Sequence, residues 1–163
     1  MKKIILIFLC FLITFILTGC AGYKPIFAPG NLKFEINDHK IEGNTKLGNQ
    51  FFFKIKNLSK INAEDQDKKS LNFIINISKD KNSTSKSAAG KILEYKITLK
   101  ANIIVSEFIN DNKFLAENLT ASVTYKVQDQ YSETIKLENK SIEDLLNKIY
   151  EEFLIKLSEK LKV

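Results

Sequence analysis

The sequence contains few of the residues that most often carry chemistry in proteins. All 25 basic residues are lysine, so arginine is absent, and there is a single histidine, His39. Without arginine, any contact with a phosphate must use ammonium groups, which bind as point charges and not as bidentate guanidinium forks. The histidine follows the first predicted strand, has no cysteine or serine motif beside it, and is expected on a solvated loop.

Catalytic motifs are absent as well. The sequence has no Gly-x-Ser-x-Gly, no His-Glu-x-x-His and no glycine-rich phosphate loop. Residues 88–91, Ala-Ala-Gly-Lys, lack the spaced glycine and the following Ser or Thr of a P-loop. We therefore expect no enzyme, no cofactor and no metal site.

Charge is spread along the chain and does not form a basic block. The lysines outnumber the 19 acidic residues, which gives a formal charge of +6. A dispersed excess of this kind predicts a mixed solvated surface, not a stripe that binds a polyanion. Aromatic residues fall within the apolar patterns, so we expect no nucleic-acid partner.

The N-terminus has the pattern of a bacterial lipoprotein signal. Two lysines precede an apolar run over residues 4–17, and Gly19-Cys20 follows. The run matches a signal sequence and is shorter than the roughly 20 residues that a membrane-spanning helix needs. In such a signal the thiol of Cys20 receives a diacylglycerol and cleavage leaves it as the new N-terminus. An uncleaved N-terminal anchor is the alternative, and it too places the rest of the chain outside the cytoplasm.

This signal sets the predicted domain boundaries. Residues 1–19 are removed, residues 20–30 form a lipidated extended tether that contains both prolines, and residues 31–163 form a single domain. Cys10 leaves with the signal, so the mature chain keeps only Cys20 and has neither a disulfide nor a cysteine-based metal site.

Four segments alternate between apolar and polar residues and are predicted to be strands. The longest match runs from Leu93 to Val105, and Glu117 interrupts the apolar parity of the last strand, where we expect a bulge or frayed start. The segments are residues 32–36, 71–77, 93–105 and 119–127.

Two segments are predicted to be helices. Residues 44–58 fit a strand as well as a helix, and we favour a helix that Asn44 or Thr45 caps. Residues 141–161 carry an apolar stripe, with Ser141 and Asp144 as a capping box. Residues 78–90 and 128–140 are expected to be polar connectors.

The order β-α-β-β-β-α predicts an α+β fold. We expect a two-layer sandwich in which two helices pack on one face of a four-stranded, mostly antiparallel sheet. The Lys, Thr, Ser and Asn face of that sheet is left without a partner from this chain.

The residues that follow Gly19 carry a family resemblance. Cys20-Ala-Gly-Tyr-Lys-Pro-Ile-Phe27 resembles the Cys-Gly-(Phe/Tyr)-x-Pro-(Leu/Ile)-(Tyr/Phe) start of the LPS-assembly lipoprotein (LptE) family, notably its alphaproteobacterial members. Ala21 departs from that pattern as one inserted residue. The order of elements is similar across most of the mature chain.

The resemblance implies a location and partners. Members of the family plug the outer-membrane β-barrel LptD, and together they insert lipopolysaccharide into the outer leaflet. By this resemblance the protein is held in the outer membrane, at its periplasmic face, by diacylglycerol and an acyl chain such as palmitate on Cys20. Ala21, where many enteric bacteria place an inner-membrane retention Asp, agrees with that location. Lysines are the candidate contacts to lipid phosphates: Lys79, Lys81, Lys86, Lys91 and Lys113.

Two other functions stay open at this point. A lipoprotein accessory of a periplasm-spanning transporter would associate with inner-membrane ATPase components. A periplasmic lipid-binding carrier would need an apolar cavity inside the sandwich.

Overall fold

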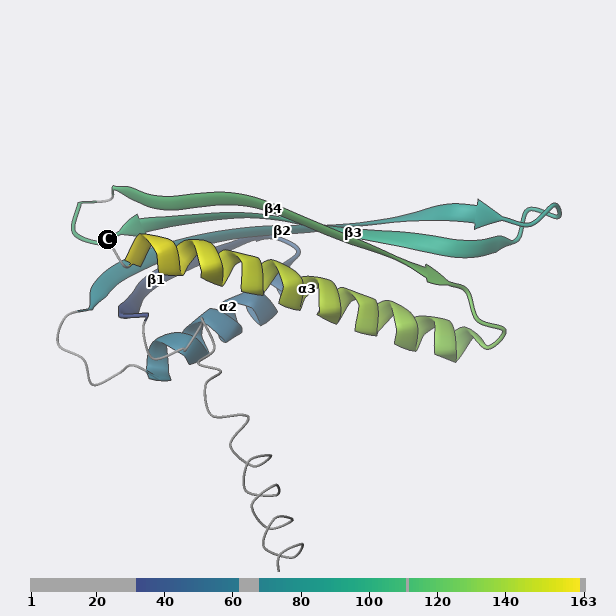
Figure 1. The fold of residues 1–163 in the computed structure, drawn as a ribbon, viewed down its shortest axis with the longest axis horizontal. Helices are drawn as coiled ribbons and strands as arrows, with labels where there is room; N and C mark the ends of the chain where they lie inside the picture. The colour runs from purple at the N-terminus through teal and green to yellow at the C-terminus, as the bar shows by residue number, and fades with distance from the viewer. Residues whose placement is uncertain (1–31, 62–67, 111, 162–163) are drawn as a thin grey trace, which may run out of the picture.

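A computed structural model describes residues 32–61, 68–110 and 112–161 of the chain. The predicted signal and tether, with Cys20, lie outside the described residues. In the described part, no helix is long and apolar enough to cross a membrane. The elements, shown in Figure 1, are β1 Phe34–Gly43, α2 Thr45–Ile61, β2 Lys69–Lys86, β3 Ile92–Glu107, β4 Lys113–Lys126 and α3 Tyr131–Leu161.

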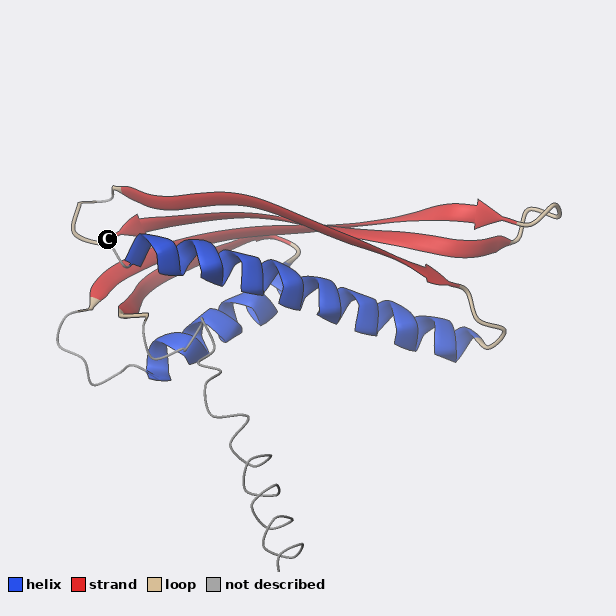
Figure 2. Cartoon of the chain, in the orientation of Figure 1, coloured by secondary structure: helices blue, strands red, loops and turns tan. Residues whose placement is uncertain are grey.

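The four strands form one sheet in the order β1-β2-β3-β4. β1 and β2 are parallel and are connected through α2, while the β2–β3 and β3–β4 pairs are antiparallel. Both helices lie on the same face of the sheet (Figure 2). The predicted α+β sandwich and its order of elements are confirmed.

The core fills the space between the sheet and the two helices. Alternate residues of β2 and β3 point into it, and the apolar stripe of α3 packs against them. Complete burial of a side chain such as Phe153 or Ile149 stabilises the fold by about 1.5–3 kcal/mol. The largest completely buried side chains are Phe34, Phe51, Phe73, Phe153, Ile55, Leu71, Ile75, Ile77, Ile97, Leu99, Ile103 and Ile149.

The ambiguous segment after β1 is a helix, as predicted. The side chain of Asn44 accepts a hydrogen bond from the Leu47 N–H at 3.1 Å, which satisfies one of the free donors at the start of α2. Gly43 precedes this cap at φ 71°, in the left-handed region, with its Cα beside the Ile77 carbonyl. The chain can therefore turn from β1 directly into α2.

The prediction of a polar connector at residues 78–90 is wrong. β2 continues to Lys86 and stays paired with β3, so that Lys79 lies opposite Leu99 and Lys81 opposite Ile97. The turn is confined to residues 87–91, where Gly90 adopts φ 80°. Backbone pairing holds this half of β2 in the sheet, although its own side chains bury little apolar surface.

α3 begins ten residues earlier than predicted, so the connector predicted at residues 128–140 and the capping box at Ser141 are also wrong. The first turn is held by Gln130, whose carbonyl accepts hydrogen bonds from the N–H groups of Glu133 and Thr134. Polar side chains of these early turns contact the sheet, and these contacts replace the apolar stripe on which the prediction relied.

His39 lies in β1 and not on a loop. A register shift between Ile36 and Asp38 changes the parity of the strand, so that His39 faces α2. Its ring stacks on Phe52, with the ring centroids 3.7 Å apart and the planes within 2°. The predicted strand of residues 32–36 was therefore too short.

The irregularity predicted near Glu117 lies three residues before it, at the beginning of β4. Glu117 pairs regularly with Ile103, and the register shift occurs between Val105 and Ser106 on the opposite strand. Phe114 is the additional residue there, which places the bulge at the beginning of β4.

Candidate functional site

A group of polar side chains lies between the far half of the β2–β3–β4 sheet and the first turns of α3. At its centre is the Glu138 carboxylate, which accepts a hydrogen bond from the Lys81 ammonium at 2.6 Å and from the Tyr125 hydroxyl at 3.0 Å. The Lys79 ammonium is 3.8 Å from the other carboxylate oxygen. Together with Tyr95 these residues form what we call the Glu138 cluster.

The sequence of β2 explains why this cluster is polar. Leu71, Phe73, Ile75 and Ile77 occupy the helix-facing side of the strand, and Lys79 and Lys81 continue that same side. Two ammonium groups therefore lie on the helix-facing side of the sheet, at the point where the apolar core ends. Glu138, whose side chain is only 13% exposed, supplies the negative charge that this location requires.

Two tyrosine rings complete the surroundings of Lys81. Its ammonium lies 4.2 Å from the centroid of the Tyr95 ring and 5.9 Å from that of Tyr125. These distances are within the range of cation–π attraction. Lys81 is thus held by a carboxylate and by two aromatic faces.

The cluster changes the acidity of its members. Burial alone would raise the pKa of Glu138, but the hydrogen bonds from Lys81 and Tyr125 outweigh burial, and its pKa lies below the usual 4.5. Burial likewise opposes the charge of Lys81, but the hydrogen bond to Glu138 prevails and raises its pKa above 10.5. Burial, with the Glu138 carboxylate adding to it, raises the pKa of Tyr125. Glu138 and Lys81 are therefore both charged at neutral pH.

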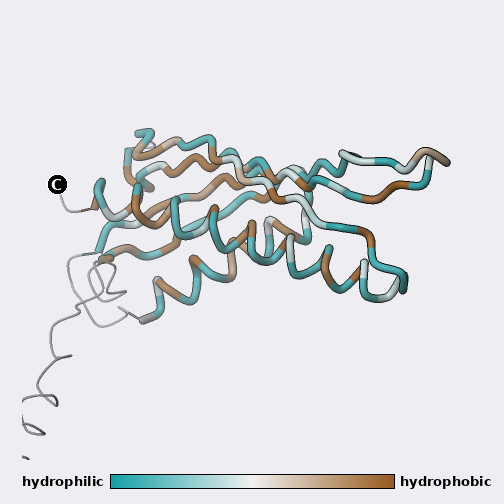
Figure 3. The backbone as a smooth tube through the Cα atoms, turned by 45° about the vertical axis from the view of Figure 1, so that its right-hand side comes forward, coloured by the Kyte–Doolittle hydropathy of each residue, from teal (hydrophilic) through white to brown (hydrophobic). Residues whose placement is uncertain are grey.

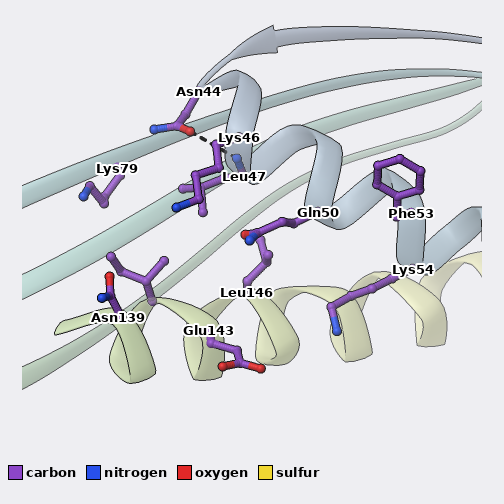
Figure 4. A pocket seen from close by; sticks show the side chains of 11 residues that line it. Asn44, Lys46, Leu47, Gln50, Phe53, Lys54, Lys79, Asn139, Glu143 and Leu146 are labelled. Atoms are coloured by element: carbon purple, nitrogen blue, oxygen red, sulfur yellow. Dashed lines mark hydrogen bonds between the residues drawn. The ribbon is translucent and has the colours of Figure 1, made fainter. Parts of the chain in front are cut away.

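Next to this cluster, an open groove of about 610 Å³ runs between α2 and α3 (Figure 4). Three lysines line it, Lys46 and Lys54 from α2 and Lys79 from β2, while Glu143 is its acidic member. Its apolar part includes Phe53, whose side chain is 56% exposed. The remaining lining residues are Asn44, Leu47, Gln50, Asn139, Ile142 and Leu146.

The groove combines cationic and apolar surface. Lysine side chains can bind an anionic group while their methylene stems and the exposed Phe53 ring contact hydrocarbon. Lys79 belongs to both the groove and the Glu138 cluster, so it connects the two. This arrangement can hold an anionic amphiphile; it does not present a nucleophile next to a base.

The structure separates the five lysines that the sequence suggested. Lys79 lines the groove and Lys81 is bound by Glu138. Lys86 ends β2, and Lys91 lies across the turn from it, where its carbonyl accepts the Ser87 N–H. Lys113 begins β4 at the opposite end of the sheet.

Sequence reasoning missed Lys46 and Lys54. They are eight residues apart on one helix, so they occupy the same face, with Gln50 between them. That spacing was a usable signal for a shared surface. Their proximity to Lys79 could not be predicted from the sequence, because it depends on how α2 packs on the sheet.

The opposite face of the sheet is covered by neither of the described helices (Figure 2) and is mostly polar, although Ile74, Ile104 and Ala116 form one apolar row across it. Asn76, Asn102 and Asn118 are neighbours across three strands, and the Asn102 amide donates to the Asn118 side-chain oxygen at 2.7 Å. Lys100 lies 3.6 Å from Asp80 on the same face. In Figure 3, hydrophobic and hydrophilic colours alternate along the strands, as expected for a sheet with one apolar and one polar face.

A metal site is not apparent in the described ranges: they contain no group of three His, Cys, Asp or Glu residues that could hold an ion.

Comparisons with known proteins reveal a shared fold. No protein-family model and no curated protein matches the chain. A crystal structure of a minor lipoprotein from Acinetobacter baumannii is similar, with a TM-score of 0.55 and 14% identity over 78% of this chain and 93% of that one. The chain has the fold of that lipoprotein.

Two further lipoproteins are similar. The rare lipoprotein B of Shewanella oneidensis has a TM-score of 0.53 and 10% identity, and the match covers 78% of this chain and all of that one. A solution structure of lipoprotein B from Nitrosomonas europaea has a TM-score of 0.52 and 13% identity over 85% of this chain and 91% of that one. At these identities the likeness concerns the fold.

Proposed function

We propose that this protein is a lipid-anchored, non-catalytic component of the outer membrane that assists a large β-barrel, LptD, in inserting lipopolysaccharide. Cys20 carries the anchor, and the domain faces the periplasm. Three observations support the proposal: the lipoprotein signal at Gly19-Cys20, the resemblance that begins at Cys20, and the fold shared with solved lipoproteins.

The uncovered, mostly polar face of the sheet is the observation that supports the proposed contact with the barrel. The interior of a wide outer-membrane barrel is polar, whereas a surface toward lipid would have to be apolar. The row of Asn76, Asn102 and Asn118 offers amide donors and acceptors that suit polar barrel side chains. A plug inside a barrel would present such a face.

The groove between α2 and α3 is the proposed contact with the glycolipid. Lys46, Lys54 and Lys79 would pair with lipid phosphates, and Phe53 and Ile142 would contact acyl chains. This assignment replaces the set suggested by the sequence with one that the fold brings together, and it retains Lys79.

Extraction of the native complex in mild detergent tests the proposal. We expect the protein to copurify with one large β-barrel in about equal amount, and depletion of the protein to lower both barrel level and surface lipopolysaccharide. A monodisperse monomer, with surface lipopolysaccharide unchanged after depletion, would contradict it. Copurification of inner-membrane ATPase components would instead support the transporter accessory.

A further inference from the structure

The turn between β3 and β4 presents two large apolar side chains to solvent. Phe108 is 53% exposed and Ile109 is 86% exposed, the highest value for a large hydrophobic residue in the described ranges. The turn is held in place: the Phe108 N–H donates to the Ser70 carbonyl at 3.0 Å and the Glu107 N–H to the Asn112 carbonyl at 3.0 Å. These side chains are thus displayed on an ordered backbone, which we call the apolar tip.

The apolar tip lies at the end of the molecule where the chain enters the domain. The Lys69 N–H donates to the Lys33 carbonyl at 3.3 Å, and the next residue of β2, Ser70, contacts Phe108. Because neighbouring strands are about 4.8 Å apart, Lys33 and Phe108 are separated by about 10 Å across β2. The described part of the chain therefore begins beside the apolar tip.

The position of Cys20 in the sequence limits how far this end can lie from its anchor. Eleven residues lie between Cys20 and Leu32, and the twelve residue-to-residue steps of a completely extended chain reach about 40 Å. If Cys20 is lipidated, the apolar tip belongs to the part of the domain that the tether keeps nearest to the bilayer.

Several lysines lie at this end of the domain. α2 and α3 both finish here (Figure 1), with Lys60 and Lys160 in their last turns. Lysines at positions 68, 69 and 113 flank the apolar tip, and the carboxylates nearby are Glu35, Glu107 and Glu159. The lysine ammonium groups beside the apolar tip can pair with anionic lipid headgroups.

We propose that Phe108 and Ile109 insert into the interface of the leaflet that holds the Cys20 anchor and form a second membrane contact. The proposal rests on the lipid anchor of the proposed function but not on the barrel. One tether leaves the domain free to rotate, whereas a second contact fixes its direction.

A single indole probe tests this contact, because the chain has no tryptophan of its own. The Phe108→Trp variant of the lipidated, full-length protein is reconstituted in vesicles of phosphatidylethanolamine and phosphatidylglycerol with brominated acyl chains. The matched control is Tyr131→Trp, which is 79% exposed at the start of α3. That helix has 31 residues and is about 46 Å long, so its start is far from the apolar tip.

We expect blue-shifted emission and quenching by bromine for Phe108→Trp, at least about twofold stronger than for Tyr131→Trp, since an interfacial side chain enters about 5–10 Å into the headgroup–acyl boundary. Adding Ile109→Ser to the Phe108→Trp variant should weaken the quenching. Equal quenching of the two probes would overturn the proposal, and so would a blue shift without quenching, which indicates that protein covers the tip.

Vesicle flotation separates this result from a failure of the anchor. A protein without lipid on Cys20 would not float with the vesicles, which would contradict the anchor on which the proposal rests. A protein that floats but shows no quenching at the apolar tip would contradict only the second contact.

Discussion

The ammonium of Lys81 in β2 and the carboxylate of Glu138 in α3 are 2.6 Å apart, although 57 residues separate them in the sequence. This pair joins the far half of the sheet to the first turns of α3, beyond the end of the apolar core. It fixes the place of Lys79 as well, because that lysine approaches the same carboxylate.

Removal of the charge at Glu138 should destabilise the fold. In Glu138→Gln the ammonium of Lys81 loses its anion in a partly buried site, and we expect a loss of about 1–3 kcal/mol in the free energy of unfolding. Urea denaturation of both proteins measures this. Glu133→Gln is the control: its pair with Lys136 is exposed, so the loss should stay below about 0.5 kcal/mol. Equal losses would contradict the role of Glu138.

The contribution of Glu138 should depend on pH in a defined direction. Its pKa is lowered by folding, so its stabilisation is complete above the unfolded value of 4.5 and is lost as the pH falls through the folded pKa. The stability difference between wild type and Glu138→Gln should be constant near neutrality and shrink below pH 4.5. Denaturation across an acid pH series measures it, and a difference that grows on acidification would refute the assignment.

The lysines of the groove should govern glycolipid binding. Replacing Lys46, Lys54 and Lys79 together with Gln removes three ammonium groups, each worth about 1 kcal/mol near an anionic headgroup, so affinity for lipopolysaccharide should fall roughly 100-fold. Isothermal titration or a surface-binding assay measures this. Lys86→Gln with Lys91→Gln provides the matched control at the β2–β3 turn. A larger loss in the control than in the groove variant would place the contact at the turn instead.

Two glycines with the same backbone conformation should respond differently to a methyl group. Gly43 and Gly90 both have positive φ, but a Cβ at Gly43 would lie 2.5 Å from the Ile77 carbonyl oxygen, whereas one at Gly90 meets nothing within 4 Å. Gly43→Ala adds a steric clash to the conformational strain and should cost about 2–3 kcal/mol or more, and Gly90→Ala about 1 kcal/mol. Thermal unfolding compares the two, and a smaller loss for Gly43→Ala would contradict the tight turn into α2.

The elements that the sequence predicted well are those that bury apolar side chains at a regular spacing. Alternation from Leu93 to Val105 predicted β3, and the stripe that ends at Leu161 predicted α3 from residue 141 to its end. The errors lie where polar side chains form regular structure through partners distant in the sequence. Lys79 and Lys81 belong to a strand because β3 pairs with it, and residues 131–140 belong to a helix whose contacts include Glu138 with Tyr125.

The candidate site could be predicted only in part for the same reason. Lys79 was named from the sequence, but the groove also needs Lys46, Lys54 and the wall that α3 provides. Periodicity predicts which face of its own helix or strand a residue occupies, but it does not predict which other element packs against that face. His39 illustrates this. It was expected on a loop, but β1 continues through it, and a one-residue register shift turns its ring toward Phe52.

Photo-crosslinking in cells tests the central claim most directly, that the uncovered sheet face lies against a barrel. A photoreactive residue is placed at Lys100 or Thr120 on that face, and at Asp144 or Lys148 on the exposed side of α3 as the control. The proposal predicts that Lys100 and Thr120 crosslink to a single outer-membrane β-barrel, and more efficiently than the control positions. Crosslinks to the barrel from α3 alone, or none from the sheet face, would contradict it.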